Sequence, residues 1–248
     1  SAAERALRIA TYNVLADAYL APAWFTHVDP AALQPGSRRE RLLSRIGGLD
    51  ADVICLQEVE PACFEFLAEG LSARGHTGVY AGKGRGRADG SACFLREDRA
   101  RLLASDAFHF RDAEPGGEDS GHLALVCHVE CALGRVHVAG THLRWAPDDA
   151  PPANHVGWRQ IRDLLDRRIG AGPARWVICG DLNGSVDSAP IRELRANGWI
   201  DACAATPQPT CNPHRRAKRI DYLLHTADLR AMPDPLPAID DHTPLPSL

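Results

Sequence analysis

The sequence predicts an α/β protein in which two β-sheets pack face to face and helices cover their outer surfaces. Two observations favour this class. Strand-length apolar runs are numerous, whereas only three or four segments have helical spacing of apolar residues. Five strand-like runs also follow one another between residues 78 and 142 without a helix between them. A doubly wound parallel sheet would instead alternate strands with helices throughout.

The first third of the chain has two strands and two helices. Residues 8–14 have the pattern of a strand, and a Pro-containing loop follows. Apolar residues at helical spacing predict a helix over residues 37–47, with Ser37 as its N-cap. Residues 52–58 form an apolar strand that ends in a carboxylate. Pro61 suits the first turn of the second helix, since proline needs no hydrogen bond there.

The middle and the last third contain the remaining elements. The five consecutive strand-like runs are residues 78–81, 91–96, 100–110, 123–130 and 135–142. An acidic, glycine-rich segment, residues 112–121, is predicted to be a loop. The last elements are a helix over 156–169, a strand over 176–180, a short helix over 190–197 and a strand over 220–224.

Size and composition predict a single domain over residues 1–248, which can be part of a longer multidomain chain. Apolar residues make up 45% of the chain and charged residues 24%, as in soluble globular proteins. The apolar runs have strand length, which argues against a membrane span. No basic leader followed by an apolar stretch opens the sequence. We therefore expect a cytoplasmic protein, monomeric and without a membrane partner.

The cysteines and the charges exclude some classes of protein. The eight cysteines form no CxxC pair, and Cys55, Cys93, Cys127 and Cys179 lie in apolar runs, which predicts free buried thiols. A net charge of −4 argues against a generally basic nucleic-acid binder. The only two lysines lie in arginine-rich stretches, which are either phosphate-binding or simply solvated loops.

Polar residues of a similar kind lie at the ends of five predicted strands. They are Asn13, Glu58, His142, the pair Asp181 and Asn183, and Asp221. Glu58 and Asp221 interrupt apolar surroundings, where a charge is costly unless it is paired or bound to a metal. Glu58 and Asn13 offer hard oxygen ligands, which suit Mg²⁺ or Mn²⁺ better than zinc. Acid, histidine and amide side chains together suit the binding of a phosphoryl group and the activation of a water.

Each of these residues also has a purely structural interpretation. Asp and Asn are common turn formers, a carboxylate can cap a helix, and a histidine after a strand is often a satisfied structural group. Asp221 has an arginine two residues away, Arg219, with which it could pair. The occurrence of all these polar residues at five strand ends of one chain is harder to explain by structural roles alone.

The order of these motifs resembles the endonuclease/exonuclease/phosphatase superfamily. The matching segments are residues 11–15, 56–59, 140–143, 180–183 and 220–222. The resemblance implies a four-layer α/β sandwich of two mostly antiparallel sheets with helices outside. It also implies hydrolysis of phosphate esters that depends on Mg²⁺ or Mn²⁺ at the edge of the sandwich.

The resemblance also implies a role for each residue. Glu58 is the expected metal ligand, supported by Asn13. His142 and Asn183 are expected to bind oxygens of the scissile phosphate, and Asp181 to position the attacking water. Asp221 is expected to be the partner of a histidine near the C-terminus.

Two further segments are similar to the deadenylase-like (nocturnin/Angel-type) branch, which acts on RNA 3′ ends or nucleotides. Residues 88–95 resemble its Asp-Gly-Cys-Ala block, and residues 141–147 resemble its His-Leu-x-Trp-x-Pro loop. The expected substrate contacts are Asp89, Trp145, Arg85, Arg87 and Lys218.

The sequence departs from the family pattern in two places. The family ends in a Ser-Asp-His block and an apolar strand, whereas Asp241 and His242 are followed by prolines that disfavour a strand. Either the chain stops before the true block and its last strand, or Asp241 and His242 form the catalytic pair. Residues 209–212 also lack the aromatic side chain that stacks on a base in the branch.

Other functions stay open. A DNA-repair-type endonuclease or a lipid phosphodiesterase has the same fold, but no extended basic face or apolar loop favours either. A catalytically impaired binding module is the alternative from another class. A serine hydrolase built on Ser120 is disfavoured, because that residue lies in a polar loop without a strand–turn–helix frame.

Overall fold

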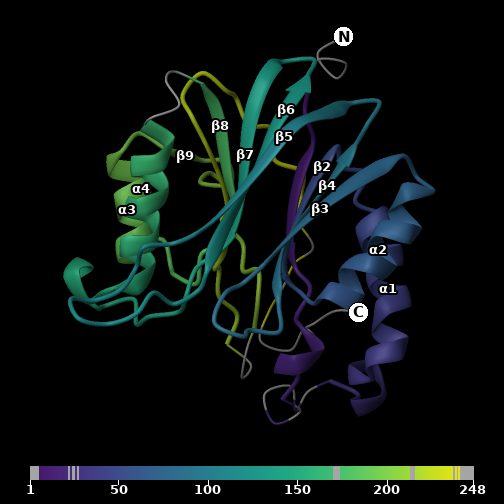
Figure 1. Cartoon of the computed structure of the whole chain (residues 1–248), viewed down its shortest axis with the longest axis horizontal. Coiled ribbons are helices and arrows are strands. Elements are labelled where there is room, and N and C mark those ends of the chain that lie inside the picture. The colour runs from purple at the N-terminus through teal and green to yellow at the C-terminus, as the bar shows by residue number, and fades with distance from the viewer. Residues whose placement is uncertain are drawn as a thin grey trace.

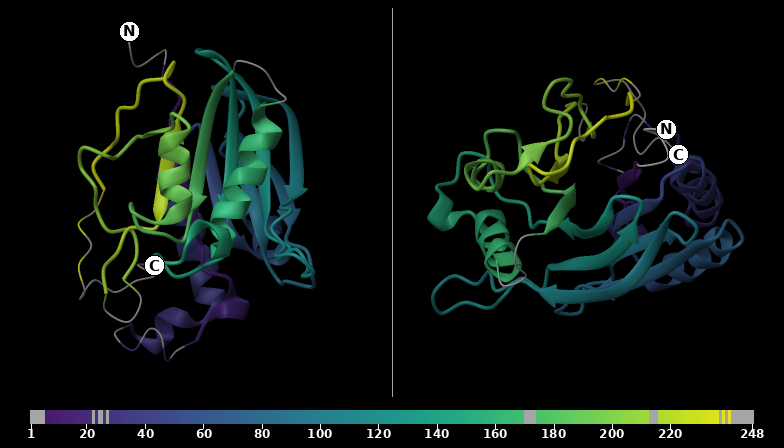
Figure 2. Two further views of the ribbon diagram at one scale, coloured as in Figure 1. Left: turned by 90° about the vertical axis from the view of Figure 1, so that its left-hand side faces the viewer. Right: turned by 90° about the horizontal axis from the view of Figure 1, so that it is seen from above.

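Two β-sheets and four α-helices form the described part of the chain in a computed structural model (Figure 1). The structure describes all residues except 1–5, 22, 24, 25, 27, 170–173, 213–215, 237, 239 and 241–248. The sheets pack face to face, and a pair of helices covers the outer face of each (Figures 1 and 2). The predicted four-layer α/β sandwich is thereby confirmed.

The four-stranded sheet has the order β1-β2-β4-β3. Its strands are β1 (Ile9–Asn13), β2 (Val53–Val59), β3 (His76–Gly82) and β4 (Gly90–Arg96). β1 runs parallel to β2, and the other pairs are antiparallel. The helices α1 (Pro35–Gly47) and α2 (Pro61–Ser72) cover this sheet because their apolar stripes pack on the outward-facing residues of β2 and β4.

The six-stranded sheet has the order β5-β6-β7-β8-β10-β9. Its strands are β5 (Ala100–His109), β6 (Leu123–Cys131), β7 (Gly134–His142), β8 (Arg175–Asp181), β9 (Ile200–Asp201) and β10 (Asp221–His225). Only β7 and β8 are parallel. The helices α3 (Val156–Ile169) and α4 (Ala189–Ala196) cover its outer face. The described residues also include the short 3-10 helices η2 (Asp17–Tyr19), η4 (Pro30–Leu33) and η5 (Pro152–Asn154).

The core between the sheets is built from the inward-facing residues of both. Val53, Leu95, Leu125 and Val138 are buried there, and each fully buried aliphatic side chain contributes about 1.5–3 kcal/mol. The four thiols singled out in the sequence lie in the same layer and are free. The strands are apolar on both faces because helices cover the outer faces, which explains their uninterrupted apolar runs.

The structure differs from the sequence prediction in three local features. Helix α1 begins at Pro35 with Gln34 as N-cap, so the prediction of Ser37 as N-cap is wrong; proline presets the first helical residue. Strand β2 continues one residue beyond Glu58. The two-residue strand β9 is too short to show a periodic pattern in the sequence. Within the described residues, no helix combines the length and apolar character needed to cross a membrane.

Candidate active site

Five strands bring polar residues to one end of the sandwich. Asn13, His142 and Asp181 are the last residues of β1, β7 and β8, and Asp221 is the first residue of the antiparallel β10. The sheet register places Asp181 between His142 and Asp221. In the four-stranded sheet, Glu58 follows Gln57, which is the register partner of Asn13. Residues far apart in the sequence therefore meet because their strands end at the same edge.

Asn13 connects the two sheets at this edge. Its Nδ2 donates to Glu58 Oε1 at 2.9 Å and to Asp181 Oδ2 at 3.1 Å. Its Oδ1 accepts from the backbone N–H of Leu15 at 2.9 Å, so Asn13 also has the turn-capping role that the sequence suggested. The amide nitrogen, and not the oxygen, faces the carboxylates. Asn13 therefore holds Glu58 and Asp181 in place, and its role as a metal ligand stays a prediction.

Glu58 lies in a distorted part of β2. Its φ is 57°, in the left-handed region, and the pairing with β4 shifts register between Leu56 and Val59. Such a bulge redirects a side chain, and left-handed backbone in a residue other than glycine costs roughly 1–3 kcal/mol. Glu58 Oε2 accepts from the N–H of Ala16 at 3.1 Å, while the N-cap of α2 is Glu60. Glu58 therefore does not cap α2.

The tight turn after β8 positions Asn183. The N–H of Asn183 donates to Asp181 Oδ1 at 2.9 Å, and Asn183 has a φ of 49°. Its Nδ2 donates to the carbonyl of Leu143 at 2.8 Å and lies 3.0 Å from His142 Nε2. Asp181 and Asn183 thus form a turn, and this turn directs the side-chain amide of Asn183 toward the imidazole of His142.

His142 is held as a neutral imidazole. Lys83 Nζ lies 3.3 Å from Nδ1 and Asn183 Nδ2 lies 3.0 Å from Nε2, so donors face both ring nitrogens. The single proton of the neutral ring already points toward one of these donors, and a second proton would point toward the other. Burial, together with the charge of Lys83, holds the pKa of His142 well below its usual range. At neutral pH His142 can exchange hydrogen bonds but carries no charge.

Three carboxylates at the edge are short of positive partners. Burial raises the pKa of Glu58, and burial with the charge of Asp221 raises the pKa of Asp181 well above its usual range. Burial raises the pKa of Asp221 to about 6. Arg219 does not neutralise Asp221 but binds Asp201 through two hydrogen bonds of 2.7 and 2.8 Å. The pairing of Asp221 with Arg219 considered from the sequence is therefore wrong.

This donor set fits a hard divalent cation. Buried carboxylates lose their hydration and repel one another when they are charged. A cation bound among them offsets both costs. Among the described residues, no group of three or more His, Cys, Asp or Glu side chains is arranged to enclose a metal. Mg²⁺ does not need such a cage, since it keeps several waters and takes one or two carboxylates together with substrate oxygens.

Lys83 belongs to the site, although only the two arginines of its stretch were predicted to contact the substrate. Its Nζ donates to Asp89 Oδ2 at 2.6 Å, and both side chains are buried. Asp89 Oδ1 also accepts from the hydroxyl of Tyr19 at 2.7 Å. A buried acid needs a cation, and the lysine six residues before Asp89 is the sequence signal that could have identified this pair.

Breaking this buried pair is expected to destabilise the fold. Lys83→Met leaves Asp89 buried without a counter-charge, and we expect the free energy of unfolding to fall by about 3 kcal/mol. Urea denaturation monitored by circular dichroism measures the change. Lys218→Met, at an exposed lysine, is the matched control and is expected to have no effect. Equal stability of the two variants would contradict the pairing.

The other predicted substrate contacts lie around the inner cluster and not in it. Arg85 forms an ion pair with Glu118, and the side chain of Arg87 donates a hydrogen bond of 3.3 Å to the carbonyl of Ser120. Lys218 is exposed, and its backbone forms an isolated β-bridge with Cys211. Trp145 is 61% exposed. His242 lies outside the described residues.

A buried polar network behind His142 was not predicted. Ser120 Oγ donates to Asp112 Oδ2 at 2.5 Å and lies 3.0 Å from His122 Nδ1. The ring of His122 meets that of His142 edge to face, with centroids 6.0 Å apart, and burial lowers the pKa of His122 to about 3. Serine lies between the acid and the histidine, so this is not the arrangement of a serine nucleophile.

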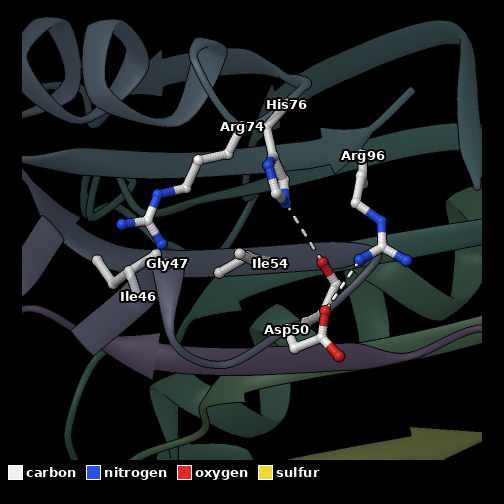
Figure 3. A pocket seen from close by; sticks show the side chains of 8 residues that line it. Ile46, Gly47, Asp50, Ile54, Arg74, His76 and Arg96 are labelled. Atoms are coloured by element: carbon white, nitrogen blue, oxygen red, sulfur yellow. Dashed lines mark hydrogen bonds and ion pairs between the residues drawn. The ribbon is translucent and has the colours of Figure 1, made fainter. Parts of the chain in front are cut away.

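A hollow of about 200 Å³ lies away from this edge (Figure 3). Ile54, Arg74, His76 and Arg96 line it, and Ile54 is near the opposite end of β2 from Glu58. Figure 3 shows the side chain of Arg96 pointing to Asp50, to which it donates a hydrogen bond of 3.0 Å. His76 Nε2 lies 3.3 Å from the carbonyl oxygen of Ala51. This hollow is separate from the candidate site.

The fold and the site together define a two-sheet α/β sandwich with an acidic, amide- and imidazole-bearing site at one edge. The chain belongs to the Endonuclease/Exonuclease/phosphatase family, whose model matches residues 10–233. This confirms the superfamily expected from the sequence.

Curated relatives include Ccr4 proteins. The CCR4-Not complex 3'-5'-exoribonuclease subunit Ccr4 of Saccharomyces cerevisiae is 27% identical over 236 residues, which cover 80% of this chain and 28% of the yeast protein. The carbon catabolite repressor protein 4 homolog 2 of Arabidopsis thaliana is 26% identical over 250 residues, with 84% and 41% covered. The chain therefore spans less than half the length of these relatives.

Similar solved structures include ANGEL2, described as a 2',3'-cyclic phosphatase, and the human Nocturnin catalytic domain with bound sulfate. ANGEL2 has a TM-score of 0.77 at 19% identity, with 90% of this chain and 83% of ANGEL2 covered. Nocturnin has a TM-score of 0.71 at 21% identity, with 89% and 82% covered. These structures show the same fold, and the Ccr4 and ANGEL2–Nocturnin similarities agree with the predicted deadenylase-like branch.

Proposed function

We propose that this protein is a divalent-metal-dependent hydrolase of phosphate esters at RNA 3′ ends or in nucleotides. The observation that carries the proposal is the bridge at the sheet edge, in which Asn13 donates to Glu58 of one sheet and to Asp181 of the other. This bridge brings two carboxylates and an amide together beside His142, whose ring nitrogens lie 4.0 Å from Glu58 Oε1 and 3.9 Å from Asp181 Oδ2. Such a set of groups suits phosphoryl transfer.

The relatives support the substrate class. The Ccr4 relatives are named as 3'-5'-exoribonuclease subunits, and ANGEL2 is named as a 2',3'-cyclic phosphatase and has been solved with adenosine-2',3'-vanadate. Both names describe chemistry at a ribose 3′ end. We therefore favour a ribonucleotide end over duplex DNA or a lipid headgroup as the substrate of this chain.

The cation is proposed to be Mg²⁺ or Mn²⁺, held by Glu58 and supported by Asn13. A bound divalent cation neutralises the charge that develops on the phosphoryl oxygens. The protein contributes the position of the ligands: the bulge in β2 aims Glu58, and hydrogen bonds from Asn13 and Ala16 fix both of its oxygens.

The remaining residues act on the phosphoryl group and on water. Asp181 is proposed to orient the attacking water and to accept its proton, because its pKa is raised toward a range suited to a general base. Asn183 and neutral His142 are proposed to donate hydrogen bonds to the phosphoryl oxygens. Their donors are fixed by the turn after β8 and by Lys83, so little reorganisation is needed in the transition state. Direct attack by water requires no covalent intermediate.

Asp221 completes the proposed set. It lies opposite Asp181 in the register of β8 and β10, and burial raises its pKa to about 6. A histidine near the C-terminus is its expected partner, and whether His242 has this role stays a prediction, since residues 241–248 are not described. Exposed Trp145 is the proposed stacking surface for a base, with Arg87 and Lys218 as phosphate contacts at the rim.

The proposal predicts hydrolysis of short oligoadenylates or of RNA with a 2′,3′-cyclic phosphate end when Mg²⁺ or Mn²⁺ is present. The measurement is product formation by chromatography, with duplex DNA and a phosphoinositide as comparison substrates and EDTA as the metal-free control. We expect turnover of at least one RNA substrate that EDTA abolishes. Turnover of duplex DNA or of the lipid alone, or EDTA-resistant turnover, would reject the proposal.

A further inference from the structure

A row of four side chains crosses the outer face of the six-stranded sheet, away from the active-site edge. The row consists of Asp106 on β5, His128 on β6, His137 on β7 and Trp176 on β8. The register pairs His128 with His137 and His137 with Trp176. His137 lies five residues before the end of β7, about 16 Å from His142 along the strand. The row is therefore separate from the proposed catalytic groups.

The two imidazoles of the row face each other through the same ring nitrogen. His128 Nδ1 and His137 Nδ1 are in hydrogen-bond contact, and the rings are nearly perpendicular, at 82° with centroids 4.7 Å apart. On one side, His128 Nε2 lies 2.8 Å from Asp106 Oδ2. On the other side, the ring of His137 is stacked on Trp176 at 4.6 Å and 25°. Each ring is thus oriented by a neighbour on a different strand.

The protons of this row can be assigned from its partners. A carboxylate oxygen only accepts, so His128 carries its proton on Nε2, toward Asp106. Neutral His128 then presents a lone pair at Nδ1, toward His137. The contact between the two Nδ1 atoms requires one proton, supplied by His137, because two bare lone pairs would repel. Burial lowers the pKa of His137, which favours the neutral form of this ring.

We propose that His128 and His137 form a binding site for a late first-row divalent cation, Cu²⁺ or Zn²⁺, through their Nδ1 atoms. The cation takes the place of the proton between the two Nδ1 atoms. His137 loses this proton from Nδ1 to solvent and takes one from solvent at Nε2, so both ligands stay neutral imidazoles and no net proton is released. Imidazole nitrogens suit these cations, whereas Mg²⁺ prefers oxygen. Asp106 positions His128 by accepting from the opposite ring nitrogen, as carboxylates commonly do for metal-bound histidines.

The site is a two-nitrogen site, and waters complete the coordination. This agrees with the absence, among the described residues, of any group of three metal-binding side chains. Two nitrogens bound tetrahedrally at about 2.0–2.1 Å from zinc lie about 3.3 Å apart, so the rings must separate slightly when the cation enters. Access is available because the side chain of His128 is 24% exposed and that of Asp106 is 74% exposed.

Trp176 provides a direct measurement, because Cu²⁺ quenches the fluorescence of a nearby indole. The protein is titrated with Cu²⁺ in excess Mg²⁺, and Zn²⁺ binding is measured by calorimetry under the same conditions. We expect one equivalent of Cu²⁺ to quench the wild type, and much less quenching in Trp176→Phe. His128→Gln and His137→Gln are each expected to weaken binding of both cations at least 10-fold. His109→Gln, on the same sheet, is the control and is expected to bind as the wild type does.

Asp106→Ala keeps both ligands and is expected to weaken binding by about 10-fold. It changes an exposed side chain, so it tests the site even if a histidine variant fails to fold. Circular dichroism checks the fold of every variant. Unchanged Cu²⁺ and Zn²⁺ affinity in the folded histidine variants would overturn the proposal, as would unchanged affinity in Asp106→Ala if neither histidine variant folds. None of these measurements depends on the proposed hydrolase activity.

Discussion

Glu58→Gln is expected to reduce metal-dependent hydrolysis by about 10³-fold or more while the fold is retained. The substitution keeps the size of the side chain, and the new amide can still accept from Asn13. It removes the only charged ligand that we assign to the cation. Without the cation, the negative charge that develops on the phosphoryl oxygens in the transition state is no longer neutralised. The measurement is the initial rate at saturating Mg²⁺ or Mn²⁺ on the RNA substrate that the wild type turns over.

Glu65→Gln is the matched control for this prediction. Glu65 is an exposed residue of α2, seven residues after Glu58, and it undergoes the same chemical change away from the site. We expect wild-type rates from it. Similar rates for Glu58→Gln and Glu65→Gln would remove Glu58 from the mechanism and, with it, the proposed position of the cation.

Asp181→Asn is expected to lower the rate by about 10²–10³-fold, because the amide cannot accept a proton from the attacking water. The isosteric change keeps an oxygen toward the N–H of Asn183, so the turn is expected to persist. A matched control is Asp187→Asn, in the loop after the turn. The rate constants of both variants are compared at saturating substrate and metal, and a loss of less than 10-fold in Asp181→Asn would assign water activation to another group.

The same substitution is expected to change the pH dependence of stability in EDTA. The pKa of Asp181 is raised well above its usual range, and that of Asp221 is raised from 3.8 to about 6. Between the unfolded and the folded pKa the folded state holds protons that the unfolded state has released, so stability falls as pH rises from about 3.8 through about 6. We expect this fall to be smaller in Asp181→Asn. Thermal melts at pH 4 to 8, with and without Mg²⁺, test this, and Mg²⁺ is expected to raise the wild-type melting temperature most at high pH.

The fold was predictable because its signals are local. Each main strand is an apolar run that ends at a polar residue or a turn, and the helical patterns have the correct period. The polar residues at the edge of the sandwich were predictable for the same reason. Asn13, His142 and Asp181 are each the last residue of a strand, and a polar residue at the end of an apolar run is visible in the sequence.

Contacts between distant segments were not predictable in this way. The contact of Lys83 with His142 depends on the burial of a loop lysine, which has no periodic signature. The partner of Arg219 is Asp201 because β9 and β10 are adjacent, although Asp221 is closer in the sequence. Sequence separation alone is a poor guide to ion pairs, since sheet register decides which side chains meet.

The sequence by itself determined the two-sheet class, the order of the strands along the chain and the residues available at their ends, because hydrophobic periodicity and turn chemistry are local properties. The tertiary structure decided how those residues face one another. It turned the amide nitrogen of Asn13 toward two carboxylates, aimed Glu58 through a bulge and brought His128 against His137. The orientation of a polar side chain depends on which donors and acceptors surround it, and only the packed sheets fix that environment.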